Sequence, residues 1–589
     1  MQTIEDLKQY TFKALLENSV KKFEKEKALS LVNGKPITYR ELYEKSLVIS
    51  NLLKNSGLKK GDKVAIYSSS MPQWGIVYFG IVNAGFIAVP LLPDFSASEI
   101  ETILEHSETK VVFVAEKMKA RLDTIKEDLI EILFKIEDFS LFYGNIDKKQ
   151  LSLNPLSPEE RKMLEEIKIQ EEDIASIIYT SGTTGRSKGV VLTHKNIVYN
   201  AVQCQTVHRV HKRDRALSFL PLSHVYEFTI GFVMQMLNGS AVYYLGKPPT
   251  VTSLLPAFKK IRPTLVLSVP MIIEKIYKNK VLPELTKTDL TKKLYQKPFF
   301  RKILHRIAGK SLNKTFGGKI NFFGFGGAKV DPEVELFMKE ARFKYAIGYG
   351  LTETAPLIAG SGTKNTIPGT IGPVLEGVEL AILNPDPETG VGEIVAKGEN
   401  IMQGYYKDEA LTKSVFTTEE DSTGSGWFKT GDLGRIDKKN RLSIKGRLKN
   451  MILNSAGENI YPEDIEFILN QHPLVTESLV VEDGNGLVAL VQLDNEKLEK
   501  EKGEGFTKMA GNTINEIKND LLYLQEEVLS EIHFFVNQKV NRISKLSAVR
   551  YIQEFEKTAS QKIKRYLYGK SKSDEENTQS ELNKKNSEE

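Results

Sequence analysis

Cysteine is nearly absent from this chain, which has 589 residues and a single thiol, Cys204. One thiol cannot form an intramolecular disulfide, and no second Cys accompanies Cys204 in a metal-binding motif. A disulfide framework and a cysteine-based metal site are therefore excluded. This sparing use of cysteine favours a reducing compartment, and we expect a cytoplasmic protein.

The sequence also lacks a secretory signal and an uninterrupted membrane-spanning run. Its first twenty residues contain no basic stretch followed by an apolar core and a small-residue cleavage site. The most apolar segment, residues 74–93, is interrupted by Gly80, Asn83, Gly85 and Pro90. This pattern predicts a buried helix that leads into a buried strand, not a bilayer span.

What the chain does have is length and 41% hydrophobic residues, enough for two or more domains. Up to about residue 440, short β-rich runs alternate with helical patterns, which predicts an α/β fold with a mostly parallel sheet covered by helices. Short strands follow close together, as in a small barrel or an antiparallel sheet. Beyond residue 447 the pattern is typical of a compact α+β unit. Residues 570–589 contain almost nothing apolar, so we expect a disordered tail.

The net charge of +5 conceals an uneven distribution. The segment from Lys275 to Lys319 carries +11, which leaves about −6 for the rest of the chain. Such a block is either a solvated face or a contact surface for an anionic partner. Residues 297–307, "KPFFRKILHRI", mix basic and apolar side chains, which suits a peripheral contact with an anionic membrane surface, such as the inner face of the cell membrane.

The stretch "YTSGTTGRSKGV", residues 179–190, combines glycines, hydroxyls and a lysine in one loop after a predicted strand. Glycines allow close backbone approach, and successive N–H groups and hydroxyls can hold phosphate oxygens. It is not a Walker loop, because Ser187 stands where that motif requires glycine. Taken alone, this composition also fits a flexible linker.

Six further motifs accompany this loop in a fixed order. They are "LPLSHVYE" at 220–227, "GFGGAK" at 324–329, "GYGLTETAP" at 348–356, "KTGDLG" at 429–434, "GRLKNMILNSAGENIYPEDIE" at 446–466 and "EKTASQKIKR" at 556–565. The set resembles the AMP-forming acyl-adenylate superfamily, which includes acyl-CoA synthetases, adenylation domains of peptide synthetases, and luciferases. Within it, the "PLSHVYE" form and the basic insertion resemble bacterial long-chain fatty acyl-CoA synthetases.

The resemblance implies a domain plan and a reaction. It implies an N-terminal domain (1–447) of two parallel α/β layers plus a small β-barrel, a small mobile α+β cap (448–569) and the tail (570–589). The expected reaction joins a fatty acid to coenzyme A, with ATP and Mg²⁺, through an acyl adenylate. Two anions must meet, so the site must neutralise charge and align the reacting atoms.

By the same resemblance, the loop wraps the β- and γ-phosphates of ATP. Its residues are Thr180, Ser181, Gly182, Thr183, Thr184 and Gly185. Lys188 supplies a cation close to the loop. The alternative for Lys188 is a solvated surface lysine with no part in binding.

The "GYGLTETAP" motif supplies the next contacts. Tyr349 offers a flat face for adenine, Gly350 lines the nucleotide and acyl positions, and Thr352 presents a hydroxyl to the α-phosphate. Glu353 provides a hard oxygen ligand for Mg²⁺.

The "GFGGAK" motif is expected to form a slot for the purine and the start of the acyl chain, from Gly326, Gly327 and Ala328. Many family members have Ser in place of Phe325 and Pro in place of Lys329. Because of these two departures, the family pattern does not define which side chains form the wall of the slot.

Three further residues have expected binding roles. Asp432 accepts both ribose hydroxyls, and Arg447 adds a contact to the ribose or phosphate. His224 lines the acyl entrance by resemblance, although a satisfied core histidine is the alternative.

The expected catalytic cation is Lys562, in a run where Gln561 replaces the glycine of the family pattern. Its ammonium can contact both the fatty carboxylate and the α-phosphate as negative charge builds in the transition state. Lys564 and Arg565 are the alternatives if the register differs.

The same lysine would block an incoming thiol, so the resemblance implies that the cap rotates between half-reactions. Lys449 occupies the hinge position. After rotation Gly457, which has no side chain, would leave a tunnel for the pantetheine arm.

Three other functions compete with the acyl-CoA ligase. Acyl carrier protein could replace coenzyme A as acceptor, because the basic block suits an acidic carrier. A nucleic-acid-binding protein lacks support, since no aromatic platform or reading motif accompanies the block. A catalytically dead scaffold is disfavoured because Lys188, Glu353, Asp432 and Lys562 are all present.

Overall fold

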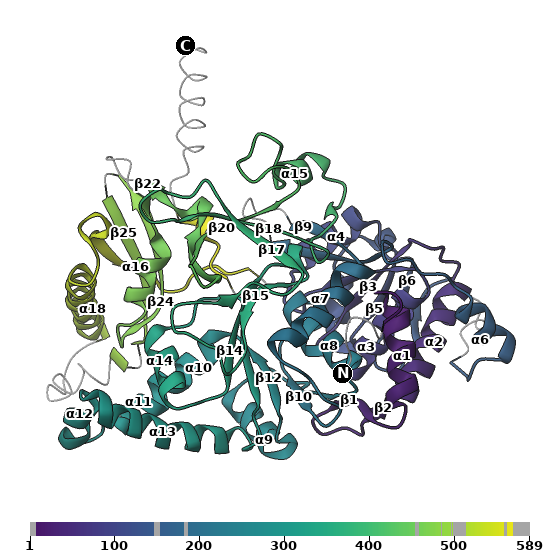
Figure 1. Ribbon diagram of the computed structural model, residues 1–589, viewed down its shortest axis with the longest axis horizontal. Helices are drawn as coiled ribbons and strands as arrows, with labels where there is room; N and C mark the ends of the chain where they lie inside the picture. Colours follow the sequence, from purple (N-terminus) through teal and green to yellow (C-terminus); the bar gives the residue numbers. More distant parts are fainter. Residues whose placement is uncertain are drawn as a thin grey trace, which may run out of the picture.

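The computed structural model describes residues 7–145, 153–181, 187–453, 459–484, 486–495, 497–498, 514–558 and 562–568. Figure 1 places the N-terminal elements at the right and the C-terminal elements at the left, above a row of helices along the lower edge. Two large sheets occupy the space between.

The first large sheet has eight strands, parallel except at its two edges. Antiparallel edge strands are common on otherwise parallel sheets. In spatial order the strands are β15 (Leu357–Ser361), β14 (Tyr345–Gly350), β13 (Phe322–Phe325), β12 (Leu265–Ser268), β10 (Arg215–Ser218), β11 (Ala241–Tyr244), β1 (Lys27–Leu31) and β2 (Ile37–Thr38).

The second large sheet also has eight strands, and its central strands are parallel. The order is β19 (Gly404–Tyr405), β9 (Ser187–Thr193), β8 (Ile174–Ser181), β4 (Ile87–Leu91), β3 (Lys63–Tyr67), β5 (Val111–Val114), β6 (Ile132–Lys135) and β7 (Leu141–Tyr143). The two sheets confirm the predicted α/β class with parallel sheets.

Helices form three layers around these sheets. The middle layer shares one apolar core with both sheets and contains α1 (Phe12–Phe23), α2 (Tyr39–Asn55), α3 (Pro72–Asn83), α7 (His194–Val207), the π-helix η4 (Glu227–Val233) and α8 (Met234–Leu237). One outer layer covers the first sheet with α9 (Val251–Ile261), α10 (Pro270–Ile276), α13 (Pro298–Thr315) and α14 (Pro332–Glu340). The other covers the second sheet with α4 (Ala97–Ser107) and α5 (Lys119–Leu122).

Local sequence explains where several of these helices begin. A hydroxyl residue caps the first turn and the third helical residue reaches back to it, as in Thr38 with Glu41, and Ser96 with Glu99. This reciprocal pattern satisfies two backbone N–H groups that have no partner within the helix. The remaining short helices are η2 (Glu116–Met118), η3 (Glu127–Leu129), α6 (Pro158–Glu165), η5 (Tyr277–Val281), α11 (Leu282–Leu285), α12 (Asp289–Tyr295), η6 (Thr352–Thr354) and α15 (Glu409–Ser414).

The apolar run at residues 74–93 is buried, as predicted. Trp74 through Asn83 are all buried in α3, and the chain then enters the fully buried strand β4. No helix within the described part of the chain is long and apolar enough to cross a membrane. Cys204 is a buried free thiol on α7, which agrees with the absence of a disulfide framework.

The predicted small barrel takes the form of a five-stranded antiparallel sheet. Its order is β16 (Gly372–Pro373), β21 (Arg441–Arg447), β20 (Phe428–Ile436), β18 (Gly392–Gly398) and β17 (Val378–Leu383). Among the described strands, the two edge strands β16 and β17 do not pair with each other, so the sheet does not close into a barrel.

Beyond β21 the chain forms the 3-10 turn η7 (Leu448–Asn450) and a two-stranded sheet of β22 (Ile452–Leu453) and β23 (Asn459–Ile460). The residues that follow have a separate apolar core. It joins α16 (Pro462–Leu469) and α18 (Ile514–Asn537) to a sheet of β24 (Val475–Asp483), β25 (Gly486–Leu493) and β26 (Leu546–Tyr551). The turns η9 (Arg542–Ser544) and η10 (Arg565–Leu567) complete it. The domain boundary at residue 447 and the mobility of this unit stay predictions.

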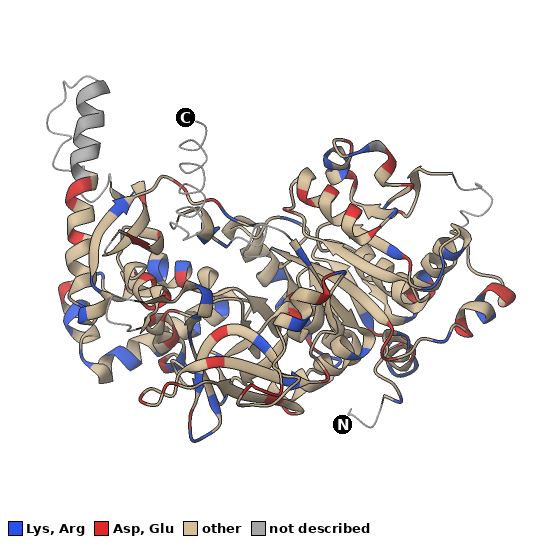
Figure 2. Cartoon of the chain, turned by 90° about the horizontal axis from the view of Figure 1, so that it is seen from above, with Lys and Arg blue, Asp and Glu red and all other residues tan. Residues whose placement is uncertain are grey.

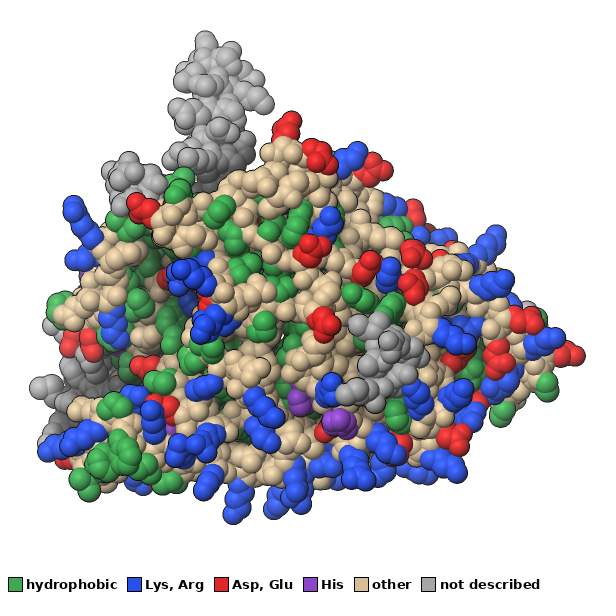
Figure 3. Space-filling view, viewed as in Figure 1, with side chains coloured by type: hydrophobic (Ala, Val, Ile, Leu, Met, Phe, Trp, Pro, Cys, Tyr) green, Lys and Arg blue, Asp and Glu red, His purple; other side chains and the backbone are tan. Residues whose placement is uncertain are grey.

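The basic block forms α12 and α13 on the lower edge of Figure 1. Arg301 anchors α13 to the core through two contacts with Glu340 of α14, at 2.9 and 3.1 Å. Acidic and basic side chains are interspersed over most of the chain (Figure 2). Figure 3 shows Lys and Arg gathered along the lower edge, with hydrophobic side chains near its α12 end.

Candidate functional site

The motif loop at residues 179–190 joins the hairpin strands β8 and β9. Thr180 pairs with Lys188 and Ser181 with Ser187 across the hairpin. Gly182, Thr183, Thr184 and Gly185 lie outside the described residues, as does the side chain of Ser181. The stem of the loop is thus an antiparallel hairpin that brings its two ends together.

Lys188 lies beside other predicted site residues. Its Nζ is 5.2 Å from the centre of the Tyr405 ring. Burial lowers the pKa of the Lys188 ammonium, the charge of Lys449 lowers it further, and Glu353 raises it. A half-buried lysine that senses Glu353 is not an isolated surface residue.

The "GYGLTETAP" motif leaves β14 through η6. A Cβ at Gly350 would lie 1.7 Å from the carbonyl oxygen of Pro356, so only glycine fits there. Tyr349 is buried, and its hydroxyl donates to Oδ2 of Asp432 at 2.7 Å. This contact links the motif to one far along the chain.

Glu353, in η6, is held by residues that the sequence analysis did not single out. The Tyr405 hydroxyl donates to Oε1 of Glu353 at 2.9 Å, and the Met402 N–H donates to its carbonyl oxygen at 2.9 Å. Thr352 is half-buried at the start of the same turn. The aromatic pair in "QGYYKD" marks Tyr405 in the sequence but does not indicate its partner.

Asp432 and Arg447 pair directly across β20 and β21. Arg447 Nε lies 2.7 Å from Oδ1 of Asp432, while Tyr349 occupies Oδ2. Burial raises the pKa of Asp432, whereas Arg447, Tyr349 and Lys562 lower it. Each carboxylate oxygen has a second lone pair, so both can still accept from a diol.

Lys562 joins this cluster from the C-terminal unit. Its side chain keeps exposed surface, yet the surrounding protein lowers the pKa of its ammonium by desolvation. Arg447 lowers that pKa further, and Asp432 and Glu353 raise it. Residues more than 100 positions apart in sequence therefore share one electrostatic environment.

The two alternatives to Lys562 have partners elsewhere. Lys564 Nζ lies 3.7 Å from Glu556, and Arg565 donates to both carboxylate oxygens of Glu466 at 2.7 Å. These pairings favour Lys562 as the cation of the cluster.

The "GFGGAK" motif begins with the last two residues of β13 and continues beyond the strand, at the carboxyl end of the sheet where α/β folds bind ligands. Gly326 is buried against the ring of Tyr226, which a Cβ would approach to 3.1 Å. Gly327 has a φ of +83°, and Ala328 is exposed. The Tyr226 ring thus covers one side of the predicted slot.

His224 lies next to Tyr226 and is only partly exposed. Burial lowers its pKa to about 4, and the charge of Lys562 contributes to the same shift. The imidazole is therefore neutral at pH 7. The charge of Lys562 acts on this imidazole, and the role of His224 at the acyl entrance stays a prediction.

Lys449 and Gly457 are the two residues predicted to act in cap rotation. Lys449 is exposed in η7, and its charge is sensed by Lys188. Gly457 lies outside the described residues.

Glu227 is the last residue of "LPLSHVYE", and the sequence predicts no role for it. It begins η4, is 2% exposed, and its Oε2 has no hydrogen-bond partner. Burial raises its pKa to about 8. A Cβ at Gly231 would lie 2.5 Å from this carboxyl group, so Gly231 leaves the space that Glu227 fills.

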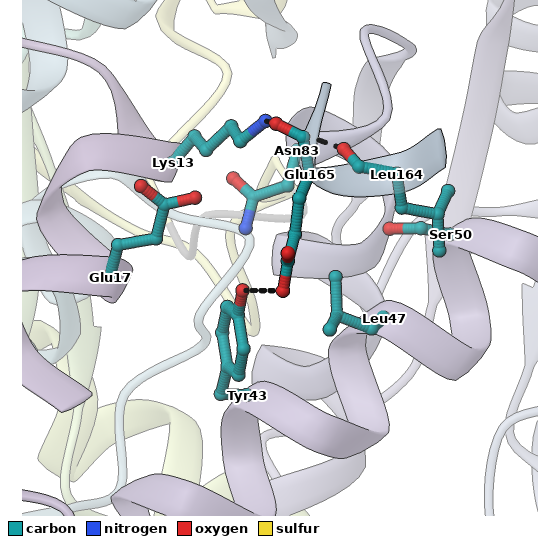
Figure 4. Close-up of a pocket in the computed structure, with 8 residues that line it drawn as sticks. All are labelled: Lys13, Glu17, Tyr43, Leu47, Ser50, Asn83, Leu164 and Glu165. Carbon is teal, nitrogen blue, oxygen red and sulfur yellow. Dashed lines mark hydrogen bonds between the residues drawn. The ribbon is translucent and has the colours of Figure 1, made fainter. Parts of the chain in front are cut away.

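A small pocket lies among helices of the N-terminal part of the chain (Figure 4). It is lined by α1, α2, α3 and α6, and Lys13 donates there to the carbonyl oxygens of Glu165 and Ile167. It contains none of the predicted site residues.

No group of three or more His, Cys, Asp or Glu side chains suited to a metal ion occurs within the described ranges. This arrangement still fits Mg²⁺, which proteins often hold through one carboxylate together with substrate phosphates. Glu353 is the carboxylate predicted for that role, and its part in binding Mg²⁺ stays a prediction.

Known structures share the fold. ATP-bound MatB from Rhodopseudomonas palustris matches with a TM-score of 0.69 at 22% identity, covering 94% of this chain and 97% of that one. A fatty acyl CoA synthetase from Mycobacterium tuberculosis matches with a TM-score of 0.63 at 21% identity, covering 96% and 99%. These matches show the fold that the chain shares with them, a mixed α/β fold with parallel sheets.

Sequence comparison gives the family. The chain belongs to the AMP-binding enzyme family, whose model matches residues 16–406. Long chain acyl-CoA synthetase 1 of Arabidopsis thaliana is 30% identical over 512 residues, covering 80% of this chain and 76% of the relative. Long-chain-fatty-acid–CoA ligase FadD15 of Mycobacterium bovis is 28% identical over 523 residues, covering 84% and 82%.

Glu227 generates a prediction about stability. Between its ordinary pKa near 4.5 and its folded pKa of about 8, the folded protein keeps a proton that the unfolded chain has released. Stability contributed by the neutral carboxyl is therefore lost as the pH rises through this window. Glu227→Gln stays neutral, so its melting temperature should fall less than that of the wild type from pH 5.5 to 8.

The matched control is Glu388→Gln, on an exposed turn. It should keep the wild-type pH dependence. If the melting temperatures of wild type and Glu227→Gln change equally with pH across this range, the assignment of a buried neutral carboxyl is contradicted.

Proposed function

We propose that the chain is an AMP-forming long-chain fatty acid–CoA ligase. The fatty carboxylate attacks the α-phosphorus of ATP and pyrophosphate leaves. The thiol of coenzyme A then attacks the acyl carbon of the adenylate, the thiol proton is released, and AMP leaves. The observation that supports this proposal is that the charges of Asp432 and Glu353, which come from separate motifs, both act on the pKa of the Lys562 ammonium.

Lys562 is the proposed catalytic residue. Its ammonium neutralises charge as the carboxylate oxygen approaches the α-phosphorus, and this interaction is strongest in the transition state. The surrounding protein lowers the pKa of this ammonium by desolvation, although the side chain keeps exposed surface.

The nucleotide contacts follow from the cluster. We assign Asp432 and Arg447 to the ribose, Tyr349 to the adenine side, and Thr352 to the α-phosphate. The phosphate loop comprises Thr180, Ser181, Gly182, Thr183, Thr184 and Gly185, with Lys188 beside it.

Glu353 would hold Mg²⁺ together with the phosphates of ATP, and the ion would supply charge neutralisation. The Tyr405 hydroxyl orients this carboxylate by occupying Oε1. An oriented carboxylate meets the strict geometry of Mg²⁺ better than a freely rotating one.

The acyl chain is assigned to the region of His224, Gly326 and Gly350, with Gly327 and Ala328 continuing the slot. A neutral imidazole and a tyrosine ring over Gly326 suit an apolar substrate. For the second half-reaction, Lys449 is the proposed hinge and Gly457 the proposed wall of the pantetheine tunnel.

The function is tested by a chain-length series of free fatty acids, assayed for AMP release with and without coenzyme A. We expect release that depends on the fatty acid and accelerates with coenzyme A. A holo acyl carrier protein serves as the competing acceptor, and preference for it would replace the coenzyme A assignment. Release of ADP would contradict AMP-forming chemistry altogether.

Lys562→Ala should slow fatty-acid-dependent pyrophosphate exchange about a hundredfold, because one preorganised contact to the developing charge is lost. Transfer from a supplied acyl adenylate to coenzyme A should be largely retained. Lys564→Ala is the matched control and should keep both activities, since its partner is Glu556. Equal loss of both steps in Lys562→Ala would refute this division.

We also propose that α12 and α13 contact an anionic membrane surface. Phe299 is 70% and Ile307 62% exposed, and Ile307 lies on the side of α13 opposite its buried residues. The exposed basic side chains of α12, α13 and the turn between them are Lys292, Lys293, Lys297, Lys302, Arg306, Lys310 and Lys314. This mixture of exposed rings, aliphatic groups and cations is typical of peripheral membrane helices.

Vesicle sedimentation tests this surface. The protein should bind vesicles that contain an anionic lipid and not purely zwitterionic ones, and added salt should weaken binding. Phe299→Ser combined with Ile307→Ser should reduce binding about tenfold or more, because two apolar contacts with the lipid are lost. Met163→Ser, exposed on α6, should bind like the wild type. Unchanged binding in the double variant would contradict the proposal.

A further inference from the structure

The loop that follows β13 contacts the C-terminal unit through Lys329. Its Nζ lies 2.9 Å from Oδ1 of Asp464 and 5.3 Å from the centre of the Phe467 ring. Asp464 and Phe467 are three residues apart on α16, so they lie on one face of that helix. Lys329 is also one of the two positions where "GFGGAK" departs from the family pattern.

Two more contacts extend this seam. Lys278 Nζ donates to the carbonyl oxygen of Asn470, the C-terminal cap residue of α16, where the helix dipole favours a cation. Lys497 Nζ donates to Oδ1 of Asn279 at 3.3 Å. The seam therefore holds α16 at both of its ends.

α16 is in turn bound to the segment that carries Lys562. Arg565 donates to both carboxylate oxygens of Glu466 on α16 and to the carbonyl oxygen of Val480 at 2.9 Å. The side chain of Glu466 is 12% exposed, which makes this pair a firm connection. A fixed α16 thus fixes the segment three residues from the catalytic ammonium.

We propose that Lys329 and Asp464 are positioning residues that select the orientation in which Lys562 enters the nucleotide cluster. The inference rests on the proposed function, and it assigns a role to the lysine that replaces the usual proline. Proline has no donor and could not make this contact.

The chemistry of the pair suits a contact that forms and breaks. Both side chains are close to half-exposed, at 48% and 41%, and exposed ion pairs are weak. A weak pair can bias the closed orientation for adenylation and still release when the cap turns for thioester formation. A buried pair would resist that release.

The orientation can be measured without any activity assay. The one native thiol, Cys204, is buried, and burial raises its pKa well above its ordinary value, so it stays unlabelled. Spin labels at Lys302→Cys and Lys545→Cys, both exposed, report the distance between α13 and the C-terminal unit. The parent should give one narrow distance, Lys329→Glu a broadened distribution, and Lys329→Glu with Asp464→Lys a narrow one again.

Kinetics gives the second readout. Lys329→Glu and Asp464→Lys should each lower the kcat of fatty-acid-dependent pyrophosphate exchange about fivefold, with the KM for ATP within about twofold of the parent value. Transfer from a supplied acyl adenylate should be unchanged. The charge-swapped double variant should recover exchange to within about twofold of wild type.

The proposal is overturned if the distance distribution of Lys329→Glu equals that of the parent, or if the charge swap fails to restore it. A wild type that shows no pyrophosphate exchange would defeat the proposed function instead. The distance measurement would still decide whether Lys329 and Asp464 set the orientation.

Discussion

The proposed site depends on bringing the ammonium of Lys562 close to the carboxylates of Asp432 and Glu353. The charges of Asp432 and Glu353 raise the pKa of Lys562, while desolvation and the charge of Arg447 lower it. ATP and a fatty acid carboxylate are both anions and repel each other, so a shared cation between them is the requirement that the remaining architecture serves. The fold meets this requirement by carrying the lysine on a unit with its own apolar core.

Tyrosines hold the carboxylates of this site. Tyr349 occupies one oxygen of Asp432, and Tyr405 occupies one oxygen of Glu353, each leaving acceptor capacity for a ligand. The carboxylates therefore have little freedom to rotate before the nucleotide arrives. Each tyrosine lies on a strand, β14 or β19, so the rigidity of the two large sheets is transmitted to the binding groups.

Much of the fold and of the candidate site could be predicted from sequence because it depends on local sequence patterns. Buried strands, the apolar helix α3 and the ordered motifs all reflect neighbouring residues. Tyr405 with Glu353, 52 positions apart, and Lys329 with Asp464, 135 apart, could not be predicted. Such pairs depend on how distant segments pack, and a tyrosine or an exposed lysine has no local feature that identifies its partner. The open edge of the five-stranded sheet likewise depends on tertiary pairing.

The most direct test of the central claim follows the oxygen atoms. A long-chain fatty acid labelled with ¹⁸O in both carboxylate oxygens is incubated with the protein, ATP, Mg²⁺ and coenzyme A, and the nucleotide product is examined by mass spectrometry. Attack of the carboxylate on the α-phosphorus predicts AMP that carries one labelled oxygen. Unlabelled AMP, or ADP as the product, would show that no acyl adenylate forms.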